Sequence, residues 1–278
     1  MITQKRFSIE IFPPKTKEGK DNLDRVCDTL NLLQPAFFSC TYGASGSTRD
    51  TTFDQVADMI SRGIDTAPHL SFGGASENDI LDLLTRYQTI GVKRIVALRG
   101  DLPAGVDGAH QLAHADYLVT FIRQYFANHF HLEVAAYPEI HPEAPSYKED
   151  IKYLKGKFDA GANSAITQYF YNADAYFYFI EECQKQGISQ PIYPGIMPLN
   201  NFAAVARFSE RCGADIPRWI AKKIEGYGDD QVSVDAFVVD FMSDMCRRLL
   251  DGGAPGFHFY SMNQIEPVKA IWQNLALS

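Results

Sequence analysis

The feature that most constrains the fold of this chain is a regular alternation. Short apolar runs, rich in β-branched and aromatic residues, alternate with longer amphipathic stretches. In stretches such as residues 77–91 and 235–253, apolar residues recur every three or four positions, the spacing of an amphipathic helix. The eight strand-like runs are residues 7–12, 35–42, 67–72, 93–98, 132–138, 164–170, 191–197 and 256–262.

Eight strand–helix units in 278 residues predict an α/β protein of the (β/α)8 TIM-barrel class, folded as a single domain over residues 1–278. The competing architecture is a doubly wound open sheet. Its dinucleotide-binding form places a G-x-G-x-x-G motif after the first strand, and no such motif follows residues 7–12. We therefore favour the barrel, which places chemistry where the strands end and the βα loops begin.

Charge and cysteine usage exclude several classes of protein. The formal net charge is −8 and the basic residues are scattered, which argues against a nucleic-acid partner. The five cysteines form no C-x-x-C pair, so neither a zinc site nor a disulfide framework is indicated. Neither a signal peptide nor an apolar run of about 20 residues, the length of a membrane span, is found. We expect a cytoplasmic protein that does not contact a membrane.

Polar residues gather at or just after the carboxyl ends of the predicted strands. Although βα loops are polar in any barrel, this concentration at one end of nearly every strand favours a functional site. Several aromatic residues fall in the same places, which suits a planar ring ligand. The polar and aromatic candidates are Glu10, Thr41, Tyr42, His69, Arg99, Gly100, Asp101, Tyr137, Glu139, His141, Gln168, Tyr169, Phe170, Tyr171 and Tyr260.

Glu10 stands out because it lies inside the apolar run FSIEIFPPK. Burying a bare carboxylate costs several kcal/mol, so this group must be solvated, paired or protonated. Two interpretations stay open from the residues alone. Glu10 is either an ion-paired core carboxylate, or a general acid whose apolar flanks help it to keep a proton.

The other candidates also have structural interpretations. Arg99 and Asp101, in LRGD, fit either a salt-bridged turn or a site. His69 and His141 lack a third ligand at metal spacing, so neutral hydrogen-bonding histidines are favoured over metal ligands. Gln168 could satisfy backbone groups or bind the edge of a heterocycle.

Eight segments, in order across nearly the whole chain, resemble the 5,10-methylenetetrahydrofolate reductases of the bacterial, single-domain kind. VALRGDLP and DAGANSAITQYF are long enough that chance is a poor explanation. The segments are FSIEIFPPK (7–15), TYGASGSTRD (41–50), APHL (67–70), RIVALRGDLP (94–103), VAAYPEIHPEA (134–144), DAGANSAITQYFY (159–171), PGIMPLNNF (194–202) and GFHFYSMN (256–263).

The resemblance implies a flavin-dependent barrel enzyme. Family members bind FAD in the barrel mouth, reduce it with NADH or NADPH, and pass hydride to methylenetetrahydrofolate to give 5-methyltetrahydrofolate, with ping-pong kinetics. The protein places the rings and tunes charge, while the flavin carries the redox chemistry. Members are often homo-oligomers. Two alternatives stay open: a related flavin-dependent barrel oxidoreductase with a different acceptor, or a folate- or flavin-binding subunit without turnover.

The resemblance also assigns roles by position. Glu10 matches the acid that protonates nitrogen 10 of the folate as its five-membered ring opens to an iminium cation. Asp101 matches the carboxylate beside the flavin and the pterin, which stabilises that cation. Gln168 and Tyr260 match folate contacts. The positions that match flavin contacts are Thr41, His69, Arg99, Gly100, Asp101, Tyr137, His141, Asp150 and Lys157.

Three positions depart from the family pattern. Ile224, in WIAKKIEG, stands where bacterial members commonly carry a stacking phenylalanine. Gln264 replaces an arginine that can approach the folate, and Tyr153 replaces an asparagine on the flavin-binding helix. These departures concern substrate affinity, nicotinamide preference and contacts to the folate tail.

Overall fold

A closed barrel of eight parallel strands forms the centre of the molecule. The computed structural model describes residues 5–41, 49–73, 75–99 and 115–277. Each strand pairs with the next along the chain, and the last pairs with the first. Every predicted run overlaps one strand, so the TIM-barrel prediction is confirmed. The strands are β1 (Arg6–Ile11), β2 (Phe37–Cys40), β3 (Thr66–Leu70), β4 (Arg94–Ala97), β5 (His131–Ala136), β6 (Ser164–Tyr169), β7 (Ile192–Ile196) and β8 (Gly256–Tyr260).

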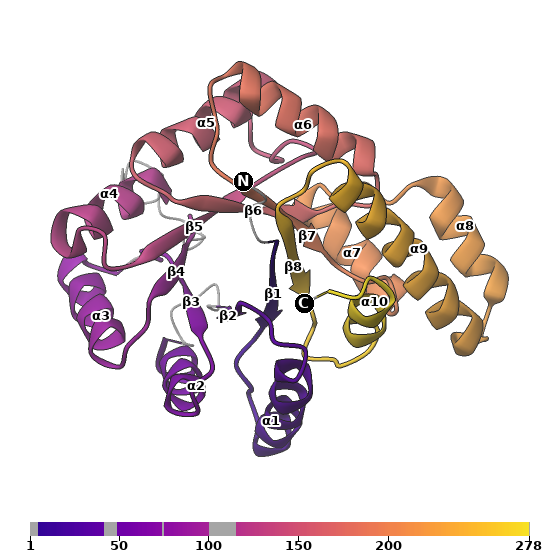
Figure 1. The fold of residues 1–278 in the computed structure, drawn as a ribbon, viewed down its shortest axis with the longest axis horizontal. Coiled ribbons are helices and arrows are strands. Elements are labelled where there is room, and N and C mark those ends of the chain that lie inside the picture. Colours follow the sequence, from indigo (N-terminus) through magenta and orange to yellow (C-terminus); the bar gives the residue numbers. More distant parts are fainter. Residues whose placement is uncertain (1–4, 42–48, 74, 100–114, 278) are drawn as a thin grey trace.

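Helices surround the barrel as an outer layer (Figure 1). In the part of the chain that the structure describes, none of them is both long and apolar enough to cross a membrane. They are α1 (Lys17–Asn31), α2 (Arg49–Ser61), α3 (Glu77–Thr89), α4 (Ala115–Phe126), α5 (Tyr147–Asp159), α6 (Ala173–Lys185), α7 (Phe202–Cys212), α8 (Arg218–Tyr227), α9 (Gln231–Asp251) and α10 (Val268–Asn274).

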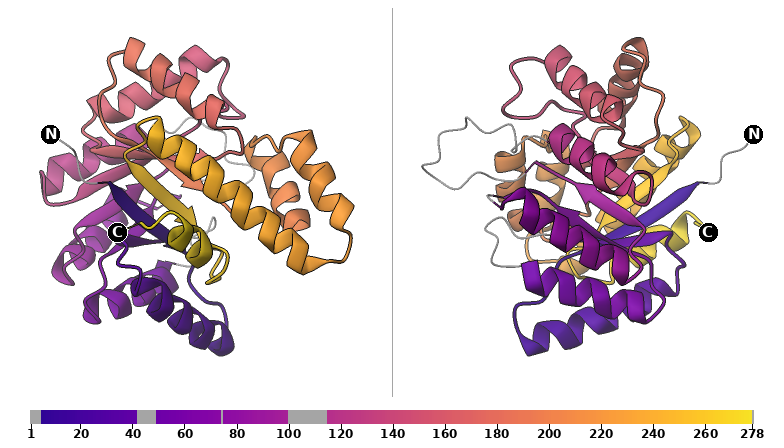
Figure 2. Two further views of the ribbon diagram at one scale, coloured as in Figure 1. Left: turned by 45° about the vertical axis from the view of Figure 1, so that its right-hand side comes forward. Right: turned by 90° about the vertical axis from the view of Figure 1, so that its left-hand side faces the viewer.

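The helices expected at residues 77–91 and 235–253 are α3 and α9, each within a few residues of its predicted bounds. Local signals fix such ends: α3 begins with a capping box, in which Ser76 and Asp79 satisfy each other's backbone N–H groups. The connection between β7 and β8 differs from a simple strand–helix unit, because it carries α7, α8 and α9. These three helices group at one side of the barrel (Figure 2).

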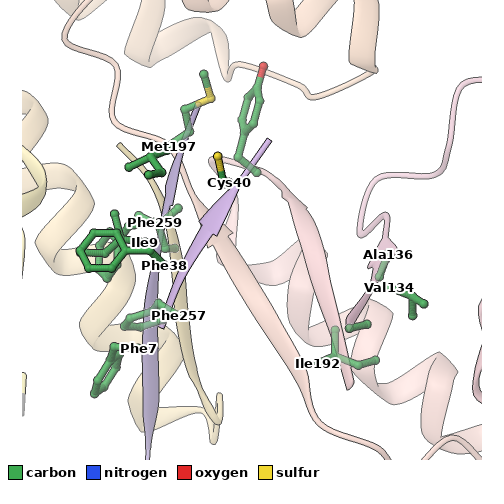
Figure 3. Packing of buried hydrophobic residues seen from close by; sticks show 14 of the residues in the cluster. Phe7, Ile9, Phe38, Cys40, Val134, Ala136, Ile192, Met197, Phe257 and Phe259 are labelled. Carbon is green, nitrogen blue, oxygen red and sulfur yellow. The ribbon is translucent and has the colours of Figure 1, made fainter. Parts of the chain in front are cut away.

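The side chains of β1 alternate between two environments. Phe7, Ile9 and Ile11 belong to the apolar core between barrel and helices. Figure 3 shows Phe7 and Ile9 close to Phe257 and Phe259 of β8. The residues between them are polar and contact other strands across the barrel, so they face its interior.

At the amino-terminal end of the barrel interior, a buried ionic cluster surrounds Glu133 of β5. Arg6 and Arg94 each donate to Glu133 Oε1, at 2.7 and 2.6 Å. The Ser164 hydroxyl donates to the other oxygen at 2.5 Å. Burial by itself raises the pKa of Glu133, but His131, Arg6 and Arg94 outweigh it and lower the pKa to about 2. The carboxylate is therefore fully paired at this end.

Candidate active site

The carboxyl ends of the strands bring most of the predicted residues to one face of the barrel. Glu10, Gln168 and Tyr260 lie on β1, β6 and β8, and His69 lies on β3. Thr41, Arg99 and Tyr137 follow the ends of β2, β4 and β5 within two residues. The predictions for Tyr42, Gly100 and Asp101 fall outside the described residues.

Glu10 lies inside the barrel mouth, and its side chain is 18% exposed. The oxygen Oε2 is 3.5 Å from His69 Nε2 and 3.8 Å from His258 Nε2. On the neighbouring strand, Tyr260 stands opposite Glu10 in the register. The apolar neighbours Ile9 and Ile11 point to the other side of the strand. The surroundings of the carboxyl are therefore imidazole and phenol groups, and the sequence-based argument from apolar flanks is wrong.

His69 is neutral at physiological pH in this arrangement. Burial lowers the pKa of His69 to about 4, against the opposing effect of Glu10. Its Nε2 atom is buried and has no hydrogen-bond partner among the described residues. The imidazole therefore does not provide a fixed cation that would hold Glu10 ionised.

His258 is a buried residue of the site that is absent from the candidates predicted from the sequence. Its ring lies between two hydroxyls: Ser8 Oγ is 2.7 Å from Nδ1, and Ser39 Oγ is 3.2 Å from Nε2. A period of two along the strands could have found it, because Ser8 precedes Glu10 by two residues and His258 precedes Tyr260 by two. These hydroxyls orient the imidazole beneath the acid.

A cavity of about 540 Å³ opens beside the ends of β4 and β5 and continues between α4 and α5. Five of the residues that match flavin contacts line it: Arg99, Tyr137, His141, Asp150 and Lys157. The remaining lining residues are Leu98, Ala115, Asp116, Ala135, Glu143, Ala144, Lys152, Tyr153 and Gly156.

The charged groups of this cavity are held in place by the backbone around them. Lys157 Nζ donates to Ala135 O at 2.8 Å, and burial lowers the pKa of Lys157 to about 8. The His141 N–H donates to Asp150 at 2.8 Å. His141 Nδ1 accepts from the backbone N–H of Glu143, so Nε2 carries the proton of the neutral ring.

These residues fit a dinucleotide with a planar ring. Cationic and N–H donors such as Lys157 and Arg99 suit a diphosphate, and the Tyr137 ring, packed edge-on against His141 at 4.5 Å, offers an aromatic wall. The cavity volume lies within the range of about 300–1,000 Å³ that is usual for cofactor sites. Thr41 and His69 lie outside the lining of this cavity.

Elsewhere in the mouth, Tyr260 of β8 and Gln168 of β6 each form a hydrogen bond with a backbone group of β6. The Tyr260 hydroxyl donates to Thr167 O at 2.8 Å. The Tyr260 ring passes over β7 at Gly195. A Cβ atom added to Gly195 would lie 2.6 Å from the Tyr260 ring and 2.2 Å from Thr167 O. Any larger residue at 195 would push the tyrosine away. Gln168 Oε1 accepts from the Tyr169 N–H at 3.1 Å.

The three departures fall in different places. Ile224 is buried in α8 and 6% exposed. Gln264 accepts a hydrogen bond from Asn200 Nδ2 at 2.6 Å, which links the loops after β7 and β8. Tyr153 lines the cavity between α4 and α5 and is 53% exposed.

Fold and site together define a class: a (β/α)8 protein with a carboxyl in its mouth and a nucleotide-sized cavity beside it. The family model for methylenetetrahydrofolate reductase matches residues 2–276. The 5,10-methylenetetrahydrofolate reductase of Escherichia coli (strain K12) is 38% identical over 275 residues, which cover 99% of this chain and 92% of that protein. The chain therefore belongs to the methylenetetrahydrofolate reductase family, a family of oxidoreductases, as the sequence motifs predict.

Other relatives differ in length or in sequence. Methylenetetrahydrofolate reductase (NADH) 1 of Arabidopsis thaliana is 35% identical over 288 residues, covering 99% of this chain but 49% of the plant protein. A solved structure from Clostridium thermocellum, described as binding two copies of 5-methyl-5,6,7,8-tetrahydrofolic acid, has a TM-score of 0.66 and 17% sequence identity. It covers 99% of this chain and 93% of its own. That similarity shows the shared fold alone.

Proposed function

We propose that this protein reduces 5,10-methylenetetrahydrofolate to 5-methyltetrahydrofolate with electrons from NADH or NADPH, using a bound FAD. Family membership supports the reaction, and relatives named as NADH and as NADPH enzymes leave both nicotinamides in the proposal. Residues 1–278 would act as one catalytic domain in the cytoplasm. FAD, when bound, supplies the hydride-transfer chemistry that amino-acid side chains lack.

The observation that carries the proposal is the position of Glu10 relative to the cavity. Glu10 lies on β1 and Tyr137 directly follows β5, four strands away in the closed barrel of eight, so the two residues face each other across the mouth. Since Tyr137 lines the cavity, a ring bound there would lie across the mouth from the acid. Ping-pong kinetics would follow if the nicotinamide and the folate take turns against such a bound ring.

Each residue of the mouth would then have a distinct task. Glu10 would donate a proton to nitrogen 10 of the folate as the five-membered ring opens. The rings of His69 and His258 would orient the carboxyl, and the uncharged His69 would not act as a fixed cation that favours the ionised form. Asp101 would stabilise the cationic folate electrostatically, and Gln168 and Tyr260 would contact the pterin and its linker.

The residues of the cavity would hold the cofactor. Lys157 and Arg99 would pair with the diphosphate, since both are cationic and line the cavity. His141 Nε2–H would donate a hydrogen bond, and Asp150 would fix the loop that carries His141. Thr41, His69, Gly100 and Tyr137 would bound the flavin ring.

An anaerobic absorption experiment tests the proposal. The purified protein should be yellow, should bleach on addition of NADH or NADPH, and should regain its colour with methylenetetrahydrofolate. Bleaching without recovery would point to a barrel oxidoreductase with another acceptor. A protein that binds flavin or folate but shows neither change would be a binding subunit, and each of these outcomes contradicts the proposed reaction.

A further inference from the structure

The outer part of the cavity, on α5, contains an exposed aromatic residue beside a glycine. Tyr153 and Gly156 both line the cavity, as do Ala115 and Asp116 of the neighbouring helix α4. The two residues are three apart on the helix, so they are neighbours on its surface. The ring of Tyr153 therefore borders a stretch of bare backbone.

Nothing in the described structure requires a glycine at position 156. Gly156 is absent from the glycines with positive φ. A Cβ atom placed on it would meet nothing within 4 Å. Glycine weakens a helix interior relative to alanine, so its presence here has a cost without a packing reason. A glycine is also used where another molecule must come close to the backbone.

Tyr153 offers a flat surface to the same space. It is 53% exposed, and within the described part of the chain its ring stacks on no other aromatic ring. Exposed aromatic rings are stacking platforms for planar bases, and such stacking tolerates any base because each has a π face. An open space bounded by a tyrosine ring and a helix backbone suits a planar heterocycle.

The position along the cavity identifies which heterocycle. Leu98, Ala135 and Tyr137 form the end next to the barrel mouth. Lys157, whose Nζ reaches Ala135 O, supplies a cation close to that end. A dinucleotide with its flavin ring at the mouth and its diphosphate at Lys157 would extend its second ring outward along α5.

We propose that Tyr153 stacks on the purine of the bound dinucleotide and that Gly156 makes room for it, so that the pair selects FAD over FMN. This inference rests on the proposed flavin cofactor. It gives a role to Tyr153, which departs from the family pattern. Tyr153 acts here as a specificity-determining contact and takes no part in proton transfer.

The test compares dissociation constants for FAD and FMN, measured by quenching of flavin fluorescence with protein freed of its flavin. Tyr153→Ala should weaken FAD binding about tenfold and leave FMN binding within about twofold of wild type. Tyr153→Phe should bind FAD like wild type, because it keeps the ring. Tyr178→Ala is the matched control, since Tyr178 of α6 is 56% exposed and lies outside the cavity lining.

A second variant separates binding from folding. Gly156→Leu should also weaken FAD binding selectively, although leucine favours the helix and should not lower the thermal midpoint of the flavin-free protein. FAD affinity unchanged in Tyr153→Ala, or equal losses for FAD and FMN, would overturn the stacking proposal. A wild-type protein that binds neither flavin would instead overturn the proposed cofactor, and the role of Tyr153 with it.

Discussion

The two ends of the barrel interior each contain a glutamate on a strand, in opposite circumstances. At the amino-terminal end, Glu133 is buried and accepts hydrogen bonds from Arg6, Arg94 and Ser164. At the carboxyl end, Glu10 is part-exposed, and the Nε2 atoms of His69 and His258 lie 3.5 and 3.8 Å from its Oε2 atom. Glu133 is therefore held by two arginines, while Glu10 lies beside two imidazole rings at the mouth of the barrel.

The difference in surroundings indicates that Glu133 stabilises the fold and that Glu10 is the candidate for proton transfer. A carboxylate whose pKa is held at about 2 cannot donate a proton near neutral pH, so Glu133 can serve only the fold. Glu10 faces His69, whose pKa of about 4 keeps it uncharged at pH 7. A carboxyl in such surroundings, open to a substrate, can exchange a proton during a reaction.

The largest effect is expected for Glu10→Gln, which removes the proposed acid. The folate half-reaction should slow about 1,000-fold, since general acid catalysis commonly contributes 10²–10⁴. Flavin reduction by NADH or NADPH should stay near the wild-type rate, because it needs no proton from Glu10. Stopped-flow measurement of each half-reaction checks this, and equal losses in both halves would refute the acid role.

Glu133→Gln, at the amino-terminal end of the barrel, should lower stability without slowing the reaction. It leaves Arg6 and Arg94 without their buried counter-ion, which costs about 3 kcal/mol of the free energy of unfolding. The folded fraction should keep its folate half-reaction rate. The matched control is Glu225→Gln, which breaks an exposed pair with Lys222 and should cost less than about 1 kcal/mol.

The pH dependence of unfolding sharpens this prediction. The pKa of Glu133 is lowered in the folded state, from an ordinary value of 4.5 to about 2. The contribution of the ionised Glu133 to the free energy of unfolding is therefore fully present above pH 4.5 and is lost as the pH falls toward 2. Urea unfolding of wild type and Glu133→Gln should converge over that window. A difference that stays constant down to pH 2 would contradict the assignment.

Asp101→Asn tests whether a second carboxylate, besides Glu10, takes part in folate reduction. Removal of this negative charge should slow folate reduction about tenfold and shift the flavin potential, because the cationic folate loses its electrostatic partner. Single-turnover reoxidation and a potentiometric titration measure the two effects. An unchanged folate rate would assign Asp101 a structural role.

The smallest effect is expected for the pH dependence of cofactor binding at Lys157. This lysine is charged below its pKa of about 8, and a diphosphate binds the charged form, so FAD affinity should fall as the pH rises above 8. Lys157→Met should bind FAD about fivefold more weakly at pH 7 and lose this pH dependence. Equilibrium titrations of FAD binding from pH 6 to 10 measure this dependence. If the FAD affinity of Lys157→Met falls in the same way above pH 8, the titrating group is another residue.

The order of the strands and the face on which the candidate polar residues gather were both predictable. Period-two and period-3.6 patterns report which side of each element is buried, and eight such units admit few closed arrangements. The roles of Glu10 and Asp101 came from the family motifs, whose membership the comparisons confirm. The roles themselves stay predictions, and Asp101 lies outside the described residues.

By itself, then, the sequence determined the barrel and the family, and it predicted which end of the barrel carries the candidate site. Only the tertiary structure decided which polar residues meet. Ser8, Ser39 and His258 come from three strands and converge beneath Glu10 because barrel closure joins β8 to β1. Likewise, Arg6 meets Glu133 across 127 positions of sequence. Such contacts depend on the register between distant strands, which no local pattern encodes, and that register pairs Glu133 with two arginines and leaves Glu10 part-exposed at the mouth.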